Sequence, residues 1–254
     1  MNQQKKVALI TGAGQGIGLE IAMQLAKSGV NILLNDIDEQ LASRAAREIQ
    51  AQTNASCLAL AGDCSEVALI TKMVAMAVAD LGSVDIVVAN AGITLFGDFL
   101  SYTPEAFHKV MQVNLAGTFF LAQTAAKQMI KQGKGGALLF MSSVTGHQAH
   151  KHLAAYSMSK AALEMLAKNL VIELSEYQIR VNCVAPGATL TERTMGDTSY
   201  EKVWSKITPL GRPASVEDIA QAAVFLVSDK AKHITGQSLI IDGGWTSVSP
   251  SPYE

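Results

Sequence analysis

The sequence predicts an α/β fold in which helices cover both faces of a doubly wound parallel sheet of about seven strands. Short runs of aliphatic and β-branched residues alternate with longer stretches in which apolar residues recur at helical spacing. Strict alternation of this kind favours parallel strands joined by right-handed crossovers. The chain of 254 residues is 49% hydrophobic, which is enough for the core of one large domain, and we expect residues 1–254 to form it.

Strands are expected where short aliphatic runs are bounded by glycine, proline or polar residues. Each predicted strand is followed by a chemically distinctive segment, which matters because ligands of such sheets bind beyond the carboxyl ends of the strands. The expected strands are residues 7–10, 31–34, 57–61, 84–89, 137–141, 179–184 and 238–241.

Helices are expected between these strands, and two of them carry clear start signals. Thr103 precedes Pro104, which gives a capping hydroxyl and a proline at the first helical position. Ser215 is followed three positions later by Asp218, which is close to a capping box. The expected helices are residues 17–28, 38–51, 66–81, 104–131, 154–176 and 215–228.

A glycine-rich stretch, Thr11 to Gly18, separates the first strand from the first helix. Glycine permits positive φ and close approach of the backbone to a ligand, and the free N–H groups of a first helical turn attract phosphate. The spacing is TGxxxGIG instead of G-x-G-x-x-G, because Ile17 occupies the position of the third glycine. Asp36 follows Gly18 by eighteen positions, at the end of the second strand. The stretch therefore predicts a dinucleotide-binding turn.

The composition argues against several classes of function. A formal net charge of −2 without a clustered Lys/Arg stripe makes nucleic acid an unexpected partner. No apolar run approaches the roughly 20 residues of a membrane span, and the start of the chain lacks the features of a signal peptide. The chain has three cysteines, Cys57, Cys64 and Cys183. Their number is odd, and their spacing is not that of metal ligands. We expect a cytoplasmic protein without a disulfide, a metal site or membrane association.

Tyr156 and Lys160 lie four positions apart in the predicted helix 154–176, so they share one face of it. Such a pair alone is most often a solvated surface contact. Ser143, at the end of the preceding strand and thirteen positions before Tyr156, adds a third group. A hydroxyl can donate to an oxygen where negative charge develops, and an ammonium stabilises the anion of a tyrosine. The three residues therefore suit proton transfer to or from an alcohol or ketone.

The TGxxxGIG turn, the Ser-Val-Thr-Gly segment and the Tyr-x-x-x-Lys pair together resemble the short-chain dehydrogenase/reductase family over almost the whole chain. The resemblance implies a Rossmann-type fold and hydride transfer between a nicotinamide cofactor and a CH–OH group. It implies Tyr156 as general acid/base, and it selects Ser143 over its neighbour Ser142 as the catalytic serine. Asn114 resembles the family's fourth catalytic residue, which supports a water chain to the lysine, although by residue type alone it is an ordinary polar residue inside a helix.

The resemblance also implies cofactor contacts along the carboxyl edge of the sheet. The turn 90–92 is expected beside the adenine ribose and the segment 186–191 at the nicotinamide carboxamide, where Thr189 departs from the usual aliphatic residue. Asp63 is expected at the adenine amino group, and the alternative, helix capping, is compatible with that contact. The expected cofactor-binding residues are Gly12, Gln15, Gly16, Ile17, Gly18, Asp36, Asp63, Cys64, Asn90, Ala91, Gly92, Tyr156, Lys160, Pro186, Gly187, Thr189 and Thr191.

Asp36 predicts NAD(H) as the cofactor. Its carboxylate is placed to accept hydrogen bonds from the adenosine ribose hydroxyls, as in NAD-specific Rossmann folds. A 2′-phosphate about 4 Å away costs roughly 1 kcal/mol in water and about 4 kcal/mol at an effective dielectric of about 20. We expect Asp38 to cap the following helix. The local positions that would supply a compensating cation hold Ala13, Gln15, Asn35 and Ile37.

Two variable segments are expected to meet the substrate. The loop 147–152 contains three histidines, but no carboxylate is near them in sequence, and we expect no metal there. The family carries a mobile lid after its sixth strand, here near 189–208, where Arg193, Tyr200 and Trp204 are candidate pocket walls. Hydrogen-bonding groups beside flat apolar rings favour a small hydroxylated substrate, such as a sugar or polyol.

Two alternatives remain. The first is a 3-oxoacyl-[acyl-carrier-protein] reductase using NADP(H), for which Lys134 is one candidate contact to the acidic carrier, whereas Tyr177 stands where a second basic residue is expected. The second is a catalytically silent dinucleotide-binding scaffold or sensor, which typically lacks the tyrosine or the lysine. Family members commonly form tetramers through their long helices, here 104–131 and 154–176, so we expect a homotetramer.

Overall fold

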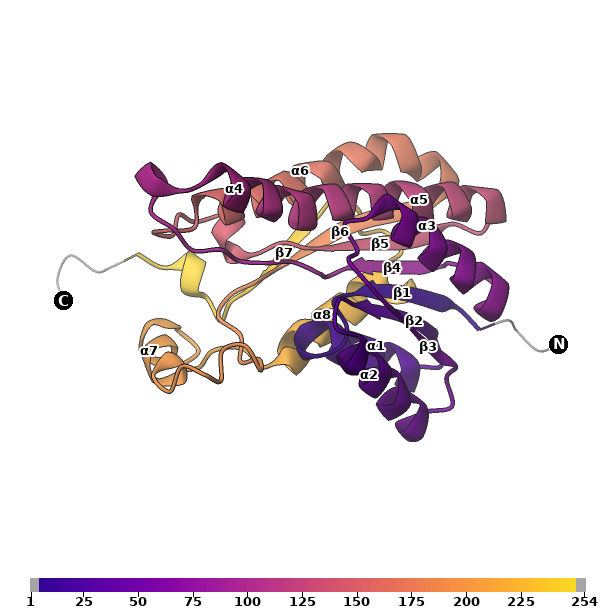
Figure 1. The fold of residues 1–254 in the computed structure, drawn as a ribbon, viewed down its shortest axis with the longest axis horizontal. Coiled ribbons are helices and arrows are strands. Elements are labelled where there is room, and N and C mark those ends of the chain that lie inside the picture. The colour runs from indigo at the N-terminus through magenta and orange to yellow at the C-terminus, as the bar shows by residue number, and fades with distance from the viewer. Residues whose placement is uncertain (1–4, 250–254) are drawn as a thin grey trace.

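The sheet contains seven parallel strands in the order β3-β2-β1-β4-β5-β6-β7, and helices cover both of its faces (Figure 1). The structure is a computed structural model that describes residues 5–249. Strand order reverses between β1 and β4, which opens a crevice at the carboxyl edge of the sheet. The predicted fold class is confirmed. The strands are β1 (Val7–Thr11), β2 (Asn31–Asp36), β3 (Cys57–Ala61), β4 (Ile86–Ala89), β5 (Gly136–Met141), β6 (Ile179–Pro186) and β7 (Ser238–Ile241).

The predicted strand boundaries agree with the structure within two residues: β2 and β6 each extend two residues further than predicted, and β4 begins two residues later. Its predicted start at Val84 is wrong, because both backbone groups of Val84 form hydrogen bonds with the side chain of Gln132. Its N–H donates to Gln132 Oε1 at 2.9 Å and its carbonyl accepts from Gln132 Nε2 at 2.9 Å. Pairing with the neighbouring strands therefore begins only at Ile86.

Three of the helices begin where the sequence places capping residues. Asp38 accepts from the N–H groups of the following turn, Thr103 caps the helix that starts with a proline, and Ser215 forms a capping box with Asp218. The helices are α1 (Gly16–Lys27), α2 (Glu39–Gln52), α3 (Val67–Met76), α4 (Pro104–Met111), α5 (Gly117–Gln132), α6 (Ala154–Leu174), α7 (Tyr200–Ile207) and α8 (Val216–Val227).

Three helix predictions need correction. The predicted helix 66–81 ends in a π-helical turn at Ala77–Leu81, and the predicted helix 104–131 contains one at Gln112–Ala116 that divides it into α4 and α5. A π turn shifts the helix register by one residue, which no apolar periodicity reveals. α7 lies in the predicted lid and was not expected as a helix. None of its residues is buried.

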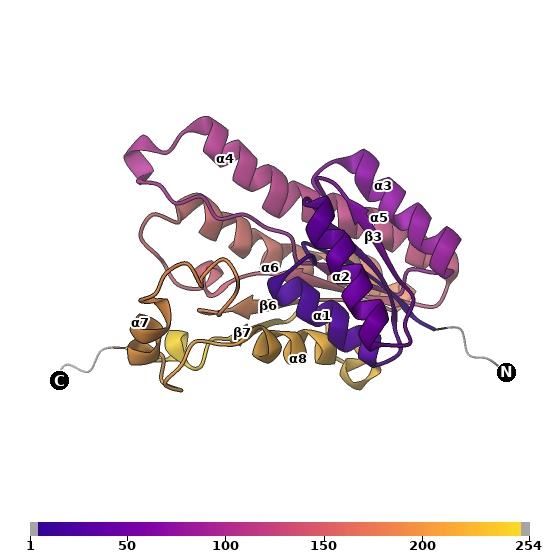
Figure 2. The same cartoon turned by 60° about the horizontal axis from the view of Figure 1, so that its bottom comes forward.

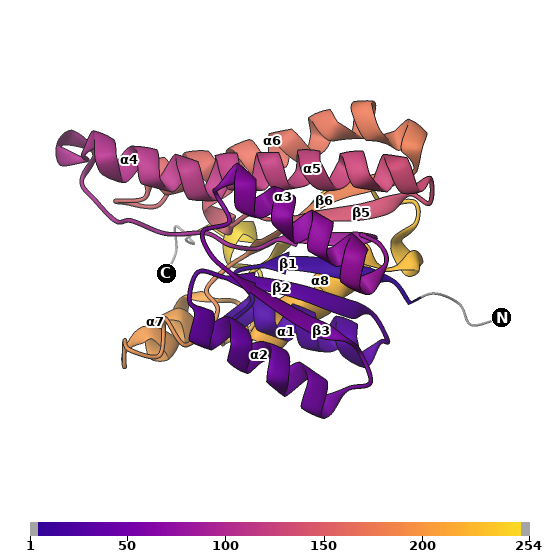
Figure 3. The same ribbon diagram turned by 45° about the vertical axis from the view of Figure 1, so that its right-hand side comes forward.

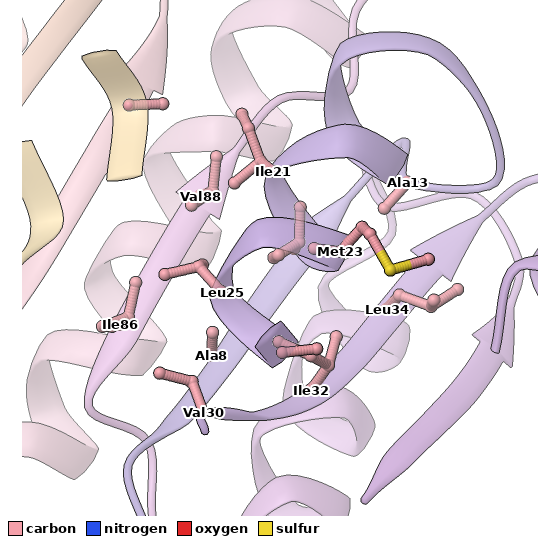
Figure 4. Packing of buried hydrophobic residues seen from close by; sticks show 14 of the residues in the cluster. Ala8, Ala13, Ile21, Met23, Leu25, Val30, Ile32, Leu34, Ile86 and Val88 are labelled. Carbon is pink, nitrogen blue, oxygen red and sulfur yellow. The ribbon is translucent and has the colours of Figure 1, made fainter. Parts of the chain in front are cut away.

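Two hydrophobic cores fill the space above and below the sheet. Helices α1, α2 and α8 cover one face, and α3, α4, α5 and α6 cover the other (Figures 1 and 3). Alternate residues of β1 belong to different cores: Ala8 and Ile10 to the first, Val7 and Leu9 to the second. Burial on both faces explains the continuous aliphatic strands. In the first core, α1 packs on three strands through Ile21 and Leu25, beside Ala8, Ile32, Ile86 and Val88 (Figure 4).

The strands point toward the end of the molecule where α7 and the start of α4 lie (Figures 1 and 2). Segments that are far apart in sequence therefore meet beyond the carboxyl ends of the strands. None of the helices within residues 5–249 is long and apolar enough to cross a bilayer.

Candidate active site

The glycine-rich turn joins β1 to α1 at the carboxyl edge of the sheet. Gly12 and Gly16 adopt φ values of +61° and +62°, which favour glycine. A Cβ on Gly12 would lie 2.8 Å from the Cα of Ala91, and one on Gly18 would collide with the carbonyl oxygen of Gly12. Gln15, the N-cap of α1, makes no side-chain cap. The first N–H groups of α1 are therefore free to meet an anionic ligand in the turn.

Asp36 ends β2 beside this turn. Its Oδ2 accepts from the N–H of Gly14 at 2.9 Å, and its Oδ1 accepts from the N–H of Asp38 at 3.2 Å. Two backbone donors from separate segments thus fix the carboxylate, and each oxygen retains a lone pair for a ligand.

A cavity of about 260 Å³ opens beside Asp36. The side chain of Ile17, like that of the buried Ala13, packs with the core beneath α1 instead of lining the cavity. The predicted cofactor contact of Ile17 is therefore through its backbone. The cavity is lined by Gly12, Gln15, Asn35, Asp36, Ile37, Gly62, Asp63, Cys64, Asn90, Ala91, Gly92, Ile93, Lys109 and Val113.

Three hydrogen-bond donors hold the carboxylate of Asp63 at this cavity. Its Oδ1 accepts from the N–H and the hydroxyl of Ser65 at 2.9 and 2.7 Å, and Lys109 Nζ donates to its Oδ2 at 3.3 Å. Burial raises the pKa of Asp63, but these hydrogen bonds outweigh it, so the pKa lies below its usual value. The capping alternative is wrong, because Glu66 is the N-cap of α3. Lys109 was missed by sequence reasoning, since it lies 46 positions away on α4.

Asn90 links the ends of β4 and β1. Its Nδ2 donates to the carbonyl oxygens of Thr11 and Gly12 at 3.0 and 2.8 Å, and the N–H of Ala91 donates to Thr11 Oγ1 at 3.2 Å. A Cβ on Gly92 would lie 3.2 Å from Lys160 Nζ. The predicted turn 90–92 therefore holds the phosphate turn and the predicted catalytic lysine close together.

Lys160 is buried at the first turns of α6. Its Nζ donates to the carbonyl oxygen of Met141 at 2.7 Å and lies 5.5 Å from the ring centre of Tyr156. Burial lowers the pKa of Lys160, and the neighbouring Tyr156 opposes this only in part. Lys160 is thus buried and Tyr156 half-buried beside it, so the predicted pair is not a solvated contact on the helix surface.

Asn114 lies in the π-helical turn between α4 and α5 and is fully buried. Its Oδ1 accepts from the N–H of Ile93 at 2.8 Å, and its Nδ2 donates to the Ile93 carbonyl at 3.0 Å and to Ser159 Oγ at 3.1 Å. Gly92 again allows the approach, because a Cβ there would lie 3.3 Å from Asn114 Oδ1. The π turn therefore brings a polar side chain from the long helix to the same place as Lys160.

The two serines after β5 differ in their hydrogen bonds. Ser143 Oγ accepts from both the N–H and the hydroxyl of Thr145, each at 3.2 Å, which leaves its own proton available to a ligand. Ser142 Oγ donates instead to Glu164 Oε1 at 2.6 Å and lies 3.1 Å from the carbonyl oxygen of Lys160. Only the Ser143 hydroxyl has a proton that is not already in use.

The predicted nicotinamide segment begins at Pro186, the last residue of β6. The N–H of Gly187 donates to the carbonyl of Ile241 at 2.9 Å, which continues the pairing with β7. Thr189 is buried, and its hydroxyl donates to the carbonyl of Gly187 at 3.1 Å. The Thr189 hydroxyl, which departs from the family pattern, thus finds its hydrogen-bond partner within the segment. Thr191 begins a turn in which its N–H donates to Thr194 Oγ1 at 2.9 Å.

The predicted lid covers the phosphate turn at one end and joins an aromatic cluster at the other. A Cβ on Gly16 would lie 3.4 Å from Glu192 Oε2, so the lid passes directly over the start of α1. Trp204 of α7 lies 5.4 Å from Trp245 and 6.2 Å from His150, measured between ring centres. His150 and Trp245 are 5.2 Å apart. Trp245 was missed, because nothing in the sequence connects the chain end to the lid.

Among residues 5–249, no group of three or more His, Cys, Asp or Glu side chains is arranged to hold a metal ion. The loop histidines have other contacts. His147 Nε2 lies 2.8 Å from Glu164 Oε1, so a carboxylate that is distant in sequence is close in space. His150 packs on the two tryptophan rings.

A family model described as enoyl-(acyl carrier protein) reductase matches residues 12–246, which include every segment described above. The chain is a short-chain dehydrogenase/reductase. Membership makes it an oxidoreductase that acts on an alcohol or ketone with a nicotinamide dinucleotide.

Known short-chain dehydrogenases/reductases resemble it along nearly their whole length. L-Rhamnose-1-dehydrogenase of Scheffersomyces stipitis is 34% identical and aligns over 94% of this chain and 95% of its own. Gluconate 5-dehydrogenase of Burkholderia cenocepacia, solved with NADP and tartrate, is 34% identical with a TM-score of 0.90 and 97% coverage of both chains. The 3-ketoacyl-(acyl-carrier-protein) reductase of Brucella melitensis, solved with NADH, is 33% identical with a TM-score of 0.89, covering 96% of this chain and 100% of its own.

Proposed function

We propose that this enzyme transfers hydride between NAD(H) and a secondary alcohol of a sugar or polyol, with Tyr156 as the general acid/base. The observation that carries the proposal is the gathering of Tyr156, Lys160 and Asn114 beside the phosphate turn, where Gly92 leaves room for two of them. Ser143 follows the neighbouring strand with a free hydroxyl proton. These groups have the chemistry that proton transfer at a CH–OH centre requires.

The residues at the carboxyl edge fit a dinucleotide. The cradle around Gly12 and Gly18 would be filled by any Cβ, and the first N–H groups of α1 have no side-chain cap. Such a cradle suits a pyrophosphate. The cofactor, when bound, supplies or accepts the hydride.

The protein residues handle the proton. In alcohol oxidation, Tyr156 accepts the proton of the substrate hydroxyl, while the Ser143 hydroxyl donates to the same oxygen as negative charge develops on it. Lys160 carries three N–H donors, of which the Met141 carbonyl takes one. The other two would be available to the nicotinamide ribose of a bound cofactor and to Tyr156, whose ring centre is 5.5 Å from Nζ, and the positive charge would stabilise the tyrosine anion. Asn114 supports the water chain that connects this lysine to solvent.

The preference for NAD(H) rests on Asp36. Its carboxylate is held by the backbone N–H groups of Gly14 and Asp38, so it is fixed where a 2′-phosphate would bring a second negative charge. Lys109 is the cationic side chain that lines the cavity beside Asp36, and it already forms an ion pair with Asp63. The solved relatives were crystallised with NADP in one case and with NADH in the other. Comparing kcat/KM for NAD and NADP tests this proposal, and better use of NADP would overturn it.

The sugar or polyol substrate is supported by the aromatic cluster of His150, Trp204 and Trp245 at the mouth of the site. Flat rings pack against the C–H faces of a sugar, while polar groups of the loop 147–152 bind hydroxyls. Relatives named for L-rhamnose and 2-dehydro-3-deoxy-D-gluconate agree with this class. An oxidation screen over sugars, polyols, hydroxy acids and steroids is the test. Efficient steroid oxidation without activity on any sugar or polyol would contradict it.

The acyl-carrier-protein reductase is the second candidate, because 3-oxoacyl and 3-ketoacyl reductases are among the relatives. Tyr177 argues against it, since this position interacts with the acidic Glu176 instead of offering a positive charge to an acidic carrier. Reduction of a 3-oxoacyl carrier-protein substrate with NADPH would establish this alternative. A catalytically silent scaffold is excluded by turnover on any substrate of either screen.

We propose that the enzyme is a homotetramer that uses the outer face of α4, α5 and α6. A groove of about 1060 Å³ runs across these helices, and its walls include Phe119, Phe120 and Met165, which are exposed in the single chain. Large exposed apolar patches mark protein contacts, and a second copy of the same groove supplies a matching surface. Light scattering coupled to size exclusion gives the mass in solution. A monomer at micromolar concentration would overturn this proposal.

We also place the enzyme in the cytoplasm. Its three cysteines are free thiols, and burial raises the pKa of Cys57 to about 12 and that of Cys64 to about 11. Thiols held in the protonated form suit a reducing compartment. Fractionation of the native cells locates the protein, and recovery outside the cytoplasmic fraction would contradict this assignment.

A further inference from the structure

One carboxylate oxygen on α6 contacts both ends of the segment that carries Ser143. Ser142, before Ser143, donates to Glu164 Oε1 at 2.6 Å. His147, after it, places Nε2 at 2.8 Å from the same Oε1. Glu164 lies one helical turn beyond Lys160 on α6, so both ends of the Ser143 segment are held by the helix that carries Tyr156 and Lys160.

This contact is enclosed by packing. Ser142 is 2% exposed, and the side chains of Glu164 and His147 are 12% and 28% exposed. A Cβ on Gly146 would lie 3.2 Å from the N of Ala161 and 3.3 Å from Glu164 Oε1, so the segment lies against α6 without spare room. Hydrogen bonds to a charged acceptor in such a setting are stronger than those on an open surface.

We propose that Glu164 is a positioning residue, which holds the Ser143 hydroxyl in register with Tyr156 and Lys160. Glu164 touches neither the substrate nor the cofactor in this proposal and acts only through the segment 142–147. The proposal rests on the proposed role of Ser143. Without Glu164, the Ser142 hydroxyl keeps only the Lys160 carbonyl as acceptor, and the His147 end of the segment loses its contact to α6.

Glu164→Ala is the first test. A displacement of about 1 Å at a reacting group costs up to about a hundredfold, so we expect kcat to fall by about ten- to a hundredfold. The dissociation constant of NADH, measured by fluorescence, should not change. Glu164→Gln keeps an oxygen for both donors and should restore kcat to within about threefold of wild type. Glu48→Ala, an exposed acid on α2, controls for loss of a charge. A kcat within twofold of wild type in folded Glu164→Ala would overturn the proposal.

A double-mutant cycle with Ser143→Ala separates positioning from other effects. If Glu164 acts through Ser143, Glu164→Ala in the Ser143→Ala background should lower kcat no further. Multiplicative losses would overturn the proposal, whereas full activity of Ser143→Ala alone would instead remove the proposed role of Ser143. Should Glu164→Ala fail to fold, Ser142→Ala removes one of the two contacts to Glu164. It should lower kcat several-fold in the wild-type background and not in Ser143→Ala, and equal losses in both backgrounds would count against the proposal.

Discussion

The cofactor side and the substrate side of the active-site edge are held together by different interactions. On the cofactor side, Asp36 and Asn90 bond backbone groups of neighbouring segments, and glycines allow the close approach. On the substrate side, His150, Trp204 and Trp245 meet through their rings, and α7 contains no buried residue. Hydrogen bonds to backbone groups fix a site for a ligand of one shape. Ring contacts between exposed segments, in contrast, tolerate replacement of the side chains. The first kind of site suits a shared cofactor and the second a variable substrate.

The largest expected effect comes from Tyr156→Phe, which acts where the two sides meet. The change removes the transferable proton and keeps the ring, so turnover should fall by about 10²- to 10⁴-fold. NADH binding, measured by fluorescence titration, should stay within a few-fold of wild type. Lys160→Ala should damage both turnover and NADH binding, because in the proposed mechanism the lysine also binds the nicotinamide ribose. Tyr156→Phe activity near that of wild type at every pH would show that another group transfers the proton.

The difference between the two sides also explains what the sequence predicted. The phosphate turn, Asp36 and the Tyr156–Lys160 pair have short local patterns, and the structure places all of them at one edge. The capping of α2 by Asp38 was equally local and is confirmed. Lys109, Trp245 and the partner of His147 come from distant positions, and no pattern in one sequence pairs them. The π turn at Asn114 was missed because apolar periodicity does not reveal it, and the backbone of Ile93, to which Asn114 bonds, is distant in sequence.

The second prediction tests whether the Asp36 carboxylate, which backbone hydrogen bonds hold in place on the cofactor side, sets the choice between NAD and NADP. Removing the charge with Asp36→Ala should narrow the preference for NAD over NADP, and Asp36→Ala with Ile37→Arg should reverse it. The expected change is about five- to a thousandfold in the ratio of kcat/KM values, depending on the local dielectric. Ile37 is exposed, so arginine fits there without disturbing the core. Asp38→Ala is the matched control, because it removes the neighbouring charge from the helix cap. An unchanged ratio in Asp36→Ala would mean that the discrimination lies elsewhere.

The third prediction concerns the substrate side alone. Trp204→Ala opens the aromatic cluster, so KM for the sugar or polyol should rise about tenfold, equivalent to about 1.4 kcal/mol of lost contact. KM for NAD should stay the same, because the ring of Trp204 packs on His150, Tyr200 and Trp245, which are not among the expected cofactor-binding residues. Val203→Ala, an exposed neighbour on α7, is the control. Equal increases in both KM values would show that the two sides are coupled through the lid.

The smallest expected effect concerns the contact between Arg212, just beyond the lid, and Asp218. We call this contact the anchor of the lid end. Arg212 Nη1 and Nη2 donate to Asp218 of the α8 capping box at 2.6 and 3.0 Å. The hydrogen bond from Arg212 is the main cause that holds the pKa of Asp218 well below its usual value, against a smaller rise from burial. Because the folded pKa is lowered, the carboxylate stabilises the fold above its unfolded pKa of about 3.9, and this contribution is lost as pH falls toward the folded value.

Asp218→Asn tests that anchor through thermal unfolding at several pH values. Asparagine can still cap, and the pair is largely solvent-exposed, so the loss at pH 7 should be only about 0.5–1 kcal/mol. In a chain of this size that corresponds to roughly 1–4 °C in Tm. The difference from wild type should be constant between pH 5 and 7 and shrink below about pH 4. A difference that persists undiminished at low pH would mean that the charge of Asp218 does not stabilise the fold. A much larger loss would mean that the lid end is held as firmly as the cofactor side, which would remove the contrast between the two.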